Sequence, residues 1–216
     1  MSLTRLYLRC FSLRAQTHAM HTDEYSLSPF ACLLGGPYLG PISLLSELQR
    51  FVPQKYNSET VLPHNTFSTW LVEGEIQYTL FCVKDPLNDN CSVMVLYDQE
   101  SDSLFYLRRE LWPRNIPVDT VVLAHFIWDT VREGRKRPNF LLFDATYWGG
   151  KRLHGTDPCE RYNLLRQIQI PENSMISVHF VGEKRTLQAF LDAVELPHKV
   201  KTVIALTSDP FKPWYE

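Results

Sequence analysis

The sequence lacks several features that would assign it to a class of protein at once. Its five cysteines lie far apart, and none of them forms a Cys-x-x-Cys pair or a cluster with histidine. This spacing argues against a zinc site or a disulfide framework and is typical of a reducing compartment. No apolar run approaches the roughly 18 residues that a membrane-spanning helix needs. We therefore predict a chain without metal, disulfide or membrane segment.

The chain also lacks a strong charge of either sign. Its 22 basic and 24 acidic residues give a formal charge of -2, so the field of the whole molecule does not attract phosphate. Any contact with a nucleic acid must then come from local patches of charge. A length of 216 residues, of which 44% are apolar, leaves room for one well-packed domain and little for a second.

Acidic residues are absent from the first 22 positions. That segment contains Arg5, Arg9 and Arg14 among serine, threonine and leucine residues, which is the composition of a mitochondrial transit peptide. The alternative is an N-terminal strand or helix that happens to lack acids. We predict that residues 1–22 are a transit peptide or an N-terminal extension and that residues 23–216 form a single domain.

Hydrophobic periodicity predicts a domain with more strands than helices. Amphipathic helices are expected over residues 42–52, 157–169 and 183–196. Strands are expected over residues 70–83, 93–97, 103–107, 120–128, 140–143, 175–181 and 199–206. This order predicts an α+β fold of mostly antiparallel sheets with flanking helices.

The most informative stretch is residues 140–150, Phe-Leu-Leu-Phe-Asp-Ala-Thr-Tyr-Trp-Gly-Gly. Its first four residues are a short apolar block, which favours a core strand over a helix. Asp144, Tyr147 and Trp148 follow this block and are expected at the exit of the strand. Two adjacent aromatic rings beside an acid predict a platform for a flat ligand.

The order of these elements, with the segments Leu71–Gly74, Thr120–Asp129, Phe140–Leu153 and Lys201–Pro213, resembles the nucleotidyltransferase domain of mRNA capping enzymes and ligases. In that superfamily the first motif is Lys-x-Asp-Gly, and its lysine attacks the α-phosphate of the nucleotide. Here the lysine position is Leu71. Leucine cannot act as a nucleophile.

Two further motifs depart from the pattern of that superfamily. The third reads Ala124-His125-Phe126 in place of an acid, glycine and glutamate, and the Asp-Gly of the fourth reads Lys201-Thr202. No OB domain is expected. We therefore predict a pseudoenzyme with no catalytic residue and no cofactor, in which His125 is a half-buried structural histidine.

Two short motifs resemble the cap-binding domain of snurportin, the import adaptor that recognises the trimethylguanosine cap of small nuclear RNAs. They are Ser68-Thr69-Trp70-Leu71 and Asp144-x-x-x-Trp148-x-Gly150. The resemblance implies that Ser68, Trp70 and Trp148 form a cap pocket, in which each stacked indole contributes about 1–3 kcal/mol. The resemblance also implies that the protein is located in the nucleus and cytoplasm. The composition of the N-terminal segment indicates the mitochondrion instead, and we prefer this location.

These observations predict a non-catalytic module that binds an RNA 5′ end, capped or triphosphorylated. The residues expected to bind the base are Ser68, Trp70, Asp144, Tyr147 and Trp148. The residues expected to bind phosphate are Arg108, Arg109, Lys151 and Arg152. Two alternatives stay open: a scaffold or assembly subunit of a ribonucleoprotein complex with protein partners, and a divergent nucleotidyltransferase that uses another lysine.

Overall fold

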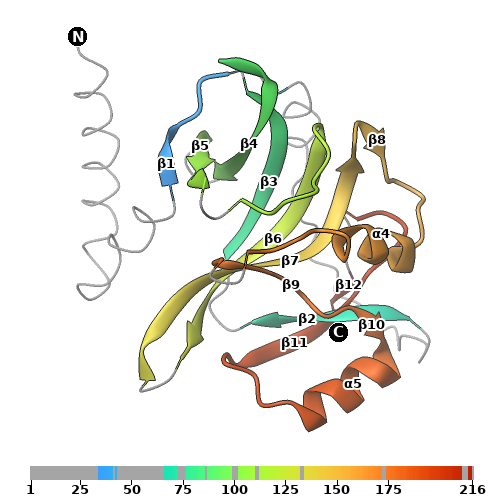
Figure 1. Cartoon of the computed structure of the whole chain (residues 1–216). Helices are drawn as coiled ribbons and strands as arrows, with labels where there is room; N and C mark the ends of the chain where they lie inside the picture. Colours follow the sequence, from blue (N-terminus) through green and yellow to red (C-terminus); the bar gives the residue numbers. More distant parts are fainter. Residues whose placement is uncertain are drawn as a thin grey trace.

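The computed structural model describes residues 34–40, 42, 66–72, 76–85, 87–98, 102–109, 112–131, 134–171, 174–210 and 214–215. The predicted transit segment and almost all of the predicted helix at residues 42–52 lie outside these ranges. Within them, twelve strands form two sheets, and two helices pack against the sheets (Figure 1). None of the helices in the described ranges has the length and apolar character needed to cross a membrane.

The larger sheet, called sheet A here, is curled and has the strand order β1-β5-β4-β3-β6-β7-β8. Its strands are β1 (Leu34–Pro37), β3 (Ile76–Asp85), β4 (Asn88–Asp98), β5 (Ser103–Leu107), β6 (Thr120–Thr130), β7 (Lys136–Trp148) and β8 (Lys151–Arg152). All these neighbours are antiparallel, and β9 (Ile176–Val178) joins β7 in parallel. The register between β6 and β7 shifts twice, at Val121/Val122 and at Leu123/Ala124. Such irregularities raise the local twist and help a sheet to curl.

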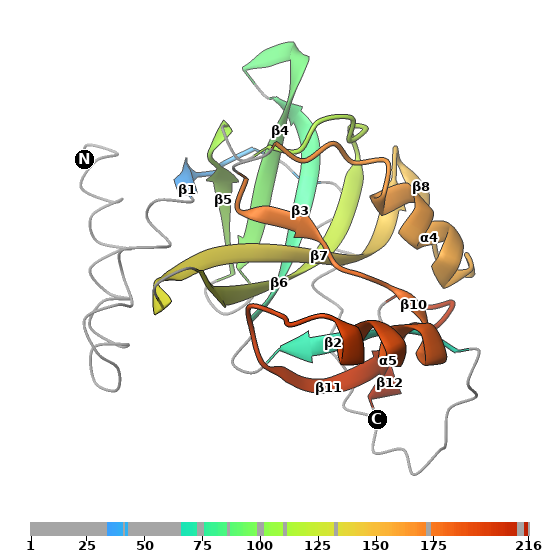
Figure 2. The same cartoon turned by 60° about the horizontal axis from the view of Figure 1, so that its bottom comes forward.

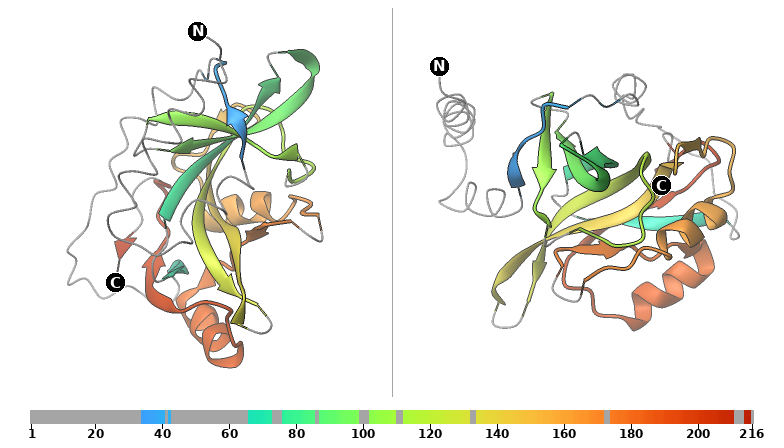
Figure 3. Two further views of the ribbon diagram at one scale, coloured as in Figure 1. Left: turned by 90° about the vertical axis from the view of Figure 1, so that its left-hand side faces the viewer. Right: turned by 45° about the horizontal axis from the view of Figure 1, so that its top comes forward.

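The smaller sheet, sheet B, has the order β10-β2-β11-β12. Its strands are β10 (Gly182–Glu183), β2 (Phe67–Val72), β11 (Val200–Ala205) and β12 (Trp214–Tyr215). Sheet B lies between sheet A and helix α5 (Lys184–Ala193) (Figures 2 and 3). Helix α4 (Pro158–Leu165) contacts β7 instead. Its start is fixed by the Asp157 carboxylate, which accepts a hydrogen bond from the Cys159 N–H at 2.8 Å, and by proline at the first helical position.

The central strands of sheet A are buried on both faces. Leu80, Leu96 and Val122 belong to the main core, whereas their neighbours Phe81 and Val121 belong to a second cluster on the other face. This two-sided burial explains why these strands read as nearly continuous apolar runs in the sequence. It also makes the middle of sheet A a rigid support for the residues at its ends.

The structure confirms several predicted elements and corrects others. The hairpin of β4 and β5 is confirmed, with Asp98 opposite Ser103, and so is the predominance of antiparallel strands. The prediction of a single strand over residues 70–83 is wrong, because β2 and β3 belong to different sheets. Gly74, which lies between them in the sequence, is the residue that could have indicated the break. The described residues are also richer in strands than the α+β prediction, with twelve strands against two helices.

Candidate functional site

The position that the resemblance assigns to the lysine nucleophile lies in an apolar cluster. Leu71 on β2 is 7% exposed. The cluster joins it to sheet A and to β11 through Leu123, Phe143, Val181, Ile204 and Leu206, all of them buried. Side chains of both sheets therefore pack around Leu71, and its own aliphatic side chain can neither attack nor bind a phosphate.

Asp144 lies inside β7 and not at the exit of a strand, because β7 continues to Trp148. Its carboxylate is buried and accepts two hydrogen bonds from Arg161 on α4, at 2.7 Å from Nε and 2.9 Å from Nη2. Burial raises the pKa of Asp144, and the Arg161 guanidinium opposes that rise. Both side chains are almost fully buried. Asp144 is thus committed to an internal ion pair, and a role at a base edge would require breaking that pair.

Two further residues of the predicted base pocket are also internal. Ser68 is buried and its hydroxyl donates to the Thr66 carbonyl at 3.1 Å. Tyr147 is buried in the second cluster of sheet A, together with Tyr38 and Val121. Because neither side chain is at the surface, neither can contact a ligand in this conformation.

Trp70 belongs to the interior as well. It is 2% exposed and packs in the cluster of Val72 and Leu187, with its ring near His179 at a centroid distance of 4.0 Å. Trp148, in contrast, is half-buried and packs against the main core of sheet A. The two indoles therefore lie in different clusters, and the structure does not bring them together into the single pocket that the resemblance implies.

A chain of hydrogen bonds connects Trp70 to sheet A. The Trp70 indole N–H donates to Nε2 of His198 at 3.2 Å, and Nδ1 of His198 lies 2.9 Å from the Asp129 carboxylate. Since an indole can only donate, Nε2 must accept, and Nδ1 must carry the proton and donate to Asp129. Asn139 on β7 donates to the other oxygen of that carboxylate at 2.8 Å. These hydrogen bonds connect β2, the segment before β11, β6 and β7.

Two more histidines are buried between the sheets. Thr69 donates its only hydroxyl hydrogen to the Phe180 carbonyl at 2.9 Å, so it must accept from Nδ1 of His179 at 3.0 Å. His125 stacks on Phe143 at a centroid distance of 4.0 Å. Burial lowers the pKa of His125 to about 3 and that of His179 well below 6.5. Both rings are neutral at physiological pH, and His125 is fully rather than half-buried.

Part of the predicted site does come together at the hairpin of β7 and β8. Trp148 pairs with Lys151 and Tyr147 pairs with Arg152 across this hairpin. Gly149 and Gly150 form the turn with φ of 57° and 79°, a backbone conformation that favours glycine. Lys151 and Arg152 are exposed. One half-buried indole and two cations therefore share one edge of sheet A.

The other two predicted phosphate ligands lie elsewhere in the sheet order. Arg108 and Arg109 are exposed and directly follow β5. Four strands, β4, β3, β6 and β7, separate β5 from β8 in sheet A. The sheet order therefore does not place the two arginine residues next to the hairpin of β7 and β8.

A metal site finds no support in the described ranges. The carboxylate of Asp129, an acid of β6, is occupied by His198 and Asn139. No group of three or more His, Cys, Asp or Glu side chains there could hold a metal ion.

Sequence reasoning missed the partners that hold the candidate residues in place. Arg161 pairs with Asp144, 17 positions away, and His198 bonds to Trp70, 128 positions away. A signal existed only for Arg161, which the helical pattern of residues 157–169 places on a helix. An arginine on the buried side of a helix requires a carboxylate partner, and Asp144 is the acid of the preceding core strand.

The comparisons with known proteins found no matching family model and no matching curated protein. Among solved structures, the chain is similar to mycobacterial DNA ligase D complexed with ATP and MES, at 16% identity and a TM-score of 0.45. It is also similar to the ligase domain of LigD from M. tuberculosis, at 16% identity and a TM-score of 0.44. Each match covers 78% of this chain and 56% of the other chain.

The first of these two structures is a DNA ligase, and the second is a ligase domain. The chain spans little more than half the length of each of them. A likeness at this level transfers no activity, ligand or partner to this chain.

Proposed function

We propose that this chain is a non-catalytic scaffold or assembly subunit of a ribonucleoprotein complex. One observation supports it above all others: Leu71, at the position of the lysine nucleophile, is packed among apolar side chains of both sheets. A residue in such a cluster supplies neither a nucleophile nor a phosphate contact. The ribonucleoprotein part of the proposal rests on the sequence resemblance to a cap-binding adaptor.

The side chains of the predicted base pocket support the same proposal. Trp70 and Asp144 are bonded to distant parts of the chain, namely to His198 and to Arg161, whereas Ser68 bonds locally to Thr66, directly before β2. The bonds of Trp70 and Asp144 help to hold the two sheets and α4 together. A protein that works by presenting its surface to partners needs such a rigid interior and no internal ligand pocket.

Two measurements test this proposal. Incubation of the purified chain with labelled ATP or GTP and Mg²⁺, followed by denaturing electrophoresis, is expected to leave the protein unlabelled. The full chain, tagged and recovered from cells, is expected to sediment faster than a 25.2 kDa monomer and to slow down after ribonuclease treatment. A covalent label would refute the absence of catalysis. Sedimentation as a monomer before and after ribonuclease would refute the assembly role.

A second function is favoured by the hairpin of β7 and β8. There Trp148 is half-buried, and Lys151 and Arg152 lie opposite it and its neighbour Tyr147. A single indole that stacks on an N7-methylated guanine, with two cations for the phosphates, would bind a capped RNA end weakly. Such a site needs only the exposed edge of Trp148 and no opening of the core.

Fluorescence titration with methylated and unmethylated cap analogues checks this second function. If it is correct, Trp148→Ala is expected to weaken binding of the methylated analogue by about 1–3 kcal/mol, the contribution of one stacked base. Trp112→Phe, which alters another half-buried indole outside this hairpin, is the control and is expected to bind as the unaltered chain does. Emission that stays flat for both analogues would leave the scaffold function as the better account.

A further inference from the structure

The end of the hairpin of β6 and β7 projects from sheet A (Figures 1 and 3). Its neighbours stop short of it, since β3 pairs with β6 only as far as Phe126 and β9 pairs with β7 only over residues 140–142. Among the strands that the structure describes, residues 127–130 and 136–139 therefore pair only with each other. These residues form a two-stranded arm, which we call the β6–β7 arm.

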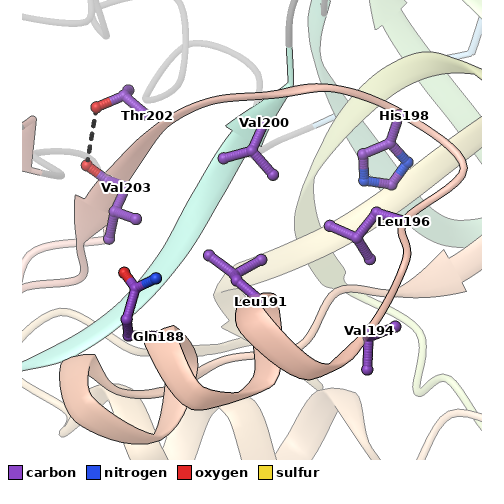
Figure 4. A pocket seen from close by; sticks show the side chains of 8 residues that line it. All are labelled: Gln188, Leu191, Val194, Leu196, His198, Val200, Thr202 and Val203. Atoms are coloured by element: carbon purple, nitrogen blue, oxygen red, sulfur yellow. Dashed lines mark hydrogen bonds between the residues drawn. The ribbon is translucent and has the colours of Figure 1, made fainter.

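Hydrogen bonds hold the connection between α5 and β11 against this arm. The Thr130 N–H donates to the Pro197 carbonyl at 2.7 Å, and the His198 ring donates to the Asp129 carboxylate at 2.9 Å. Figure 4 shows His198 within that connection. Arg137 is directly opposite Asp129 in the arm. The fold therefore brings the start of β11 next to the arm.

The two segments that meet here are strongly basic. In the described residues 127–131, 134–139 and 194–201, the acids are Asp129, which is buried and bonded to His198, and Glu195, which is exposed. Arg132 and Glu133, which stand between the two strands in the sequence, cancel in charge. The exposed cations of the same segments are Arg135, Lys136, Arg137, Lys199 and Lys201. This end of the molecule thus carries a local excess of positive charge.

The placement of these cations favours a long anion over a small one. Lys136 and Arg137 extend to opposite faces of the arm, because successive side chains of a strand alternate. Within the described ranges, neither of them forms an ion pair. A single free phosphate cannot contact both faces. A phosphate backbone that passes around the end of the arm can, since it presents charges at regular spacing.

Trp128 selects RNA over an acidic protein segment. It is half-buried, and it lies on the same face of the arm as Lys136, because Trp128 pairs with Pro138 and Lys136 pairs with Thr130. An unpaired base can stack on the exposed part of the indole while its phosphate meets the lysine. An acidic segment would use the cations alone.

We propose that the β6–β7 arm, together with Lys199 and Lys201, binds the phosphate backbone of a single-stranded RNA, and that Trp128 stacks on one of its bases. Such contacts recognise no base sequence. The surface lies at the opposite end of β7 from Trp148. This inference rests on the proposed ribonucleoprotein function and names the surface through which the chain contacts RNA.

Fluorescence anisotropy with a labelled, uncapped single-stranded RNA of about 20 nucleotides tests the inference on the full chain at several salt concentrations. The double variant Lys136→Gln/Arg137→Gln is expected to weaken binding about tenfold. It is also expected to reduce the slope of log affinity against log salt by about 1.4, because each phosphate contact of a single strand contributes about 0.7.

The double variant Arg166→Gln/Arg185→Gln is the matched control. It removes two exposed arginine residues, one after α4 and one in the first turn of α5. Both double variants lose two positive charges, so they change the field of the whole molecule equally. The control is expected to bind this RNA within about twofold of the unaltered chain and with the same salt slope.

Ultraviolet crosslinking of the same RNA, followed by mass spectrometry, is expected to give adducts on peptides of the arm. The inference is overturned if the chain does not bind the RNA, if the two double variants lose affinity equally, if the adducts lie elsewhere, or if polyglutamate of matched charge binds as tightly. Such a failure is distinct from that of the ribonucleoprotein function. Sedimentation that still slows after ribonuclease would keep that function and assign the RNA contact to another surface or subunit.

Discussion

Replacing Arg161 by methionine is expected to lower the free energy of unfolding by about 3–5 kcal/mol, the cost of leaving one partner of a buried ion pair alone. Arg161 donates to both oxygens of Asp144 and also to the carbonyls of Thr156 and Thr207. Methionine fills similar volume but donates nothing. These four oxygen atoms would then lose the N–H group that donates to them. Urea denaturation followed by circular dichroism measures the change.

The loss of stability in this variant is expected to depend on pH. The pKa of Asp144 is raised by burial, and Arg161 holds it down; without Arg161 it rises further. A carboxyl with a raised pKa binds its proton more tightly in the folded state, so its contribution to stability is present at low pH and is lost as pH rises through the folded pKa. The difference between the variant and the unaltered chain is therefore expected to be larger at pH 7 than at pH 4.

Matched variants separate the ion pair from the loss of a long side chain. Arg166→Met alters an exposed arginine that follows α4 and is expected to change stability by less than about 0.5 kcal/mol. Adding Asp144→Asn to Arg161→Met removes the unpaired charge and is expected to restore part of the loss. Equal losses for the Arg161 and Arg166 variants would contradict the role of the pair.

The fold could be predicted in part because its signals are local. The turn between β4 and β5 and the capped start of α4 are set by neighbouring residues, such as Asp157 and Pro158. The assignment of β2 to a second sheet was missed, since its pairing with β11 joins Trp70 to Val203, 133 positions apart in the chain. Pairing at that distance leaves no periodic pattern in either segment.

The candidate site was predicted less well, for a different physical reason. The identity of an aromatic or acidic residue in a motif does not show whether its side chain faces a ligand or packs against a partner in the core. Trp70 and Asp144 satisfy their polar groups with His198 and Arg161, and no spacing rule connects these pairs. Trp148, Lys151 and Arg152 did come together, because they belong to one short hairpin.

Replacing Trp70 by alanine is expected to lower the free energy of unfolding by about 3–5 kcal/mol, the usual cost of truncating a buried tryptophan. Its ring packs with Val72, Leu187 and Phe190, so truncation opens a cavity between β2 and α5. It also leaves Nε2 of His198 without the indole N–H that now donates to it. The free energy is again measured by urea denaturation with circular dichroism.

Trp70→Phe separates the hydrogen bond from the packing. Phenylalanine keeps most of the apolar contact but has no N–H, so Nε2 of His198 loses its donor in the interior, at a cost of about 1–3 kcal/mol. Trp148→Phe is the control, because Trp148 is half-buried and its indole lies outside this hydrogen-bond chain; it is expected to cost less. A Trp70→Phe chain as stable as the unaltered protein would show that the indole N–H adds nothing to folding, and a role for it in binding a ligand would regain support.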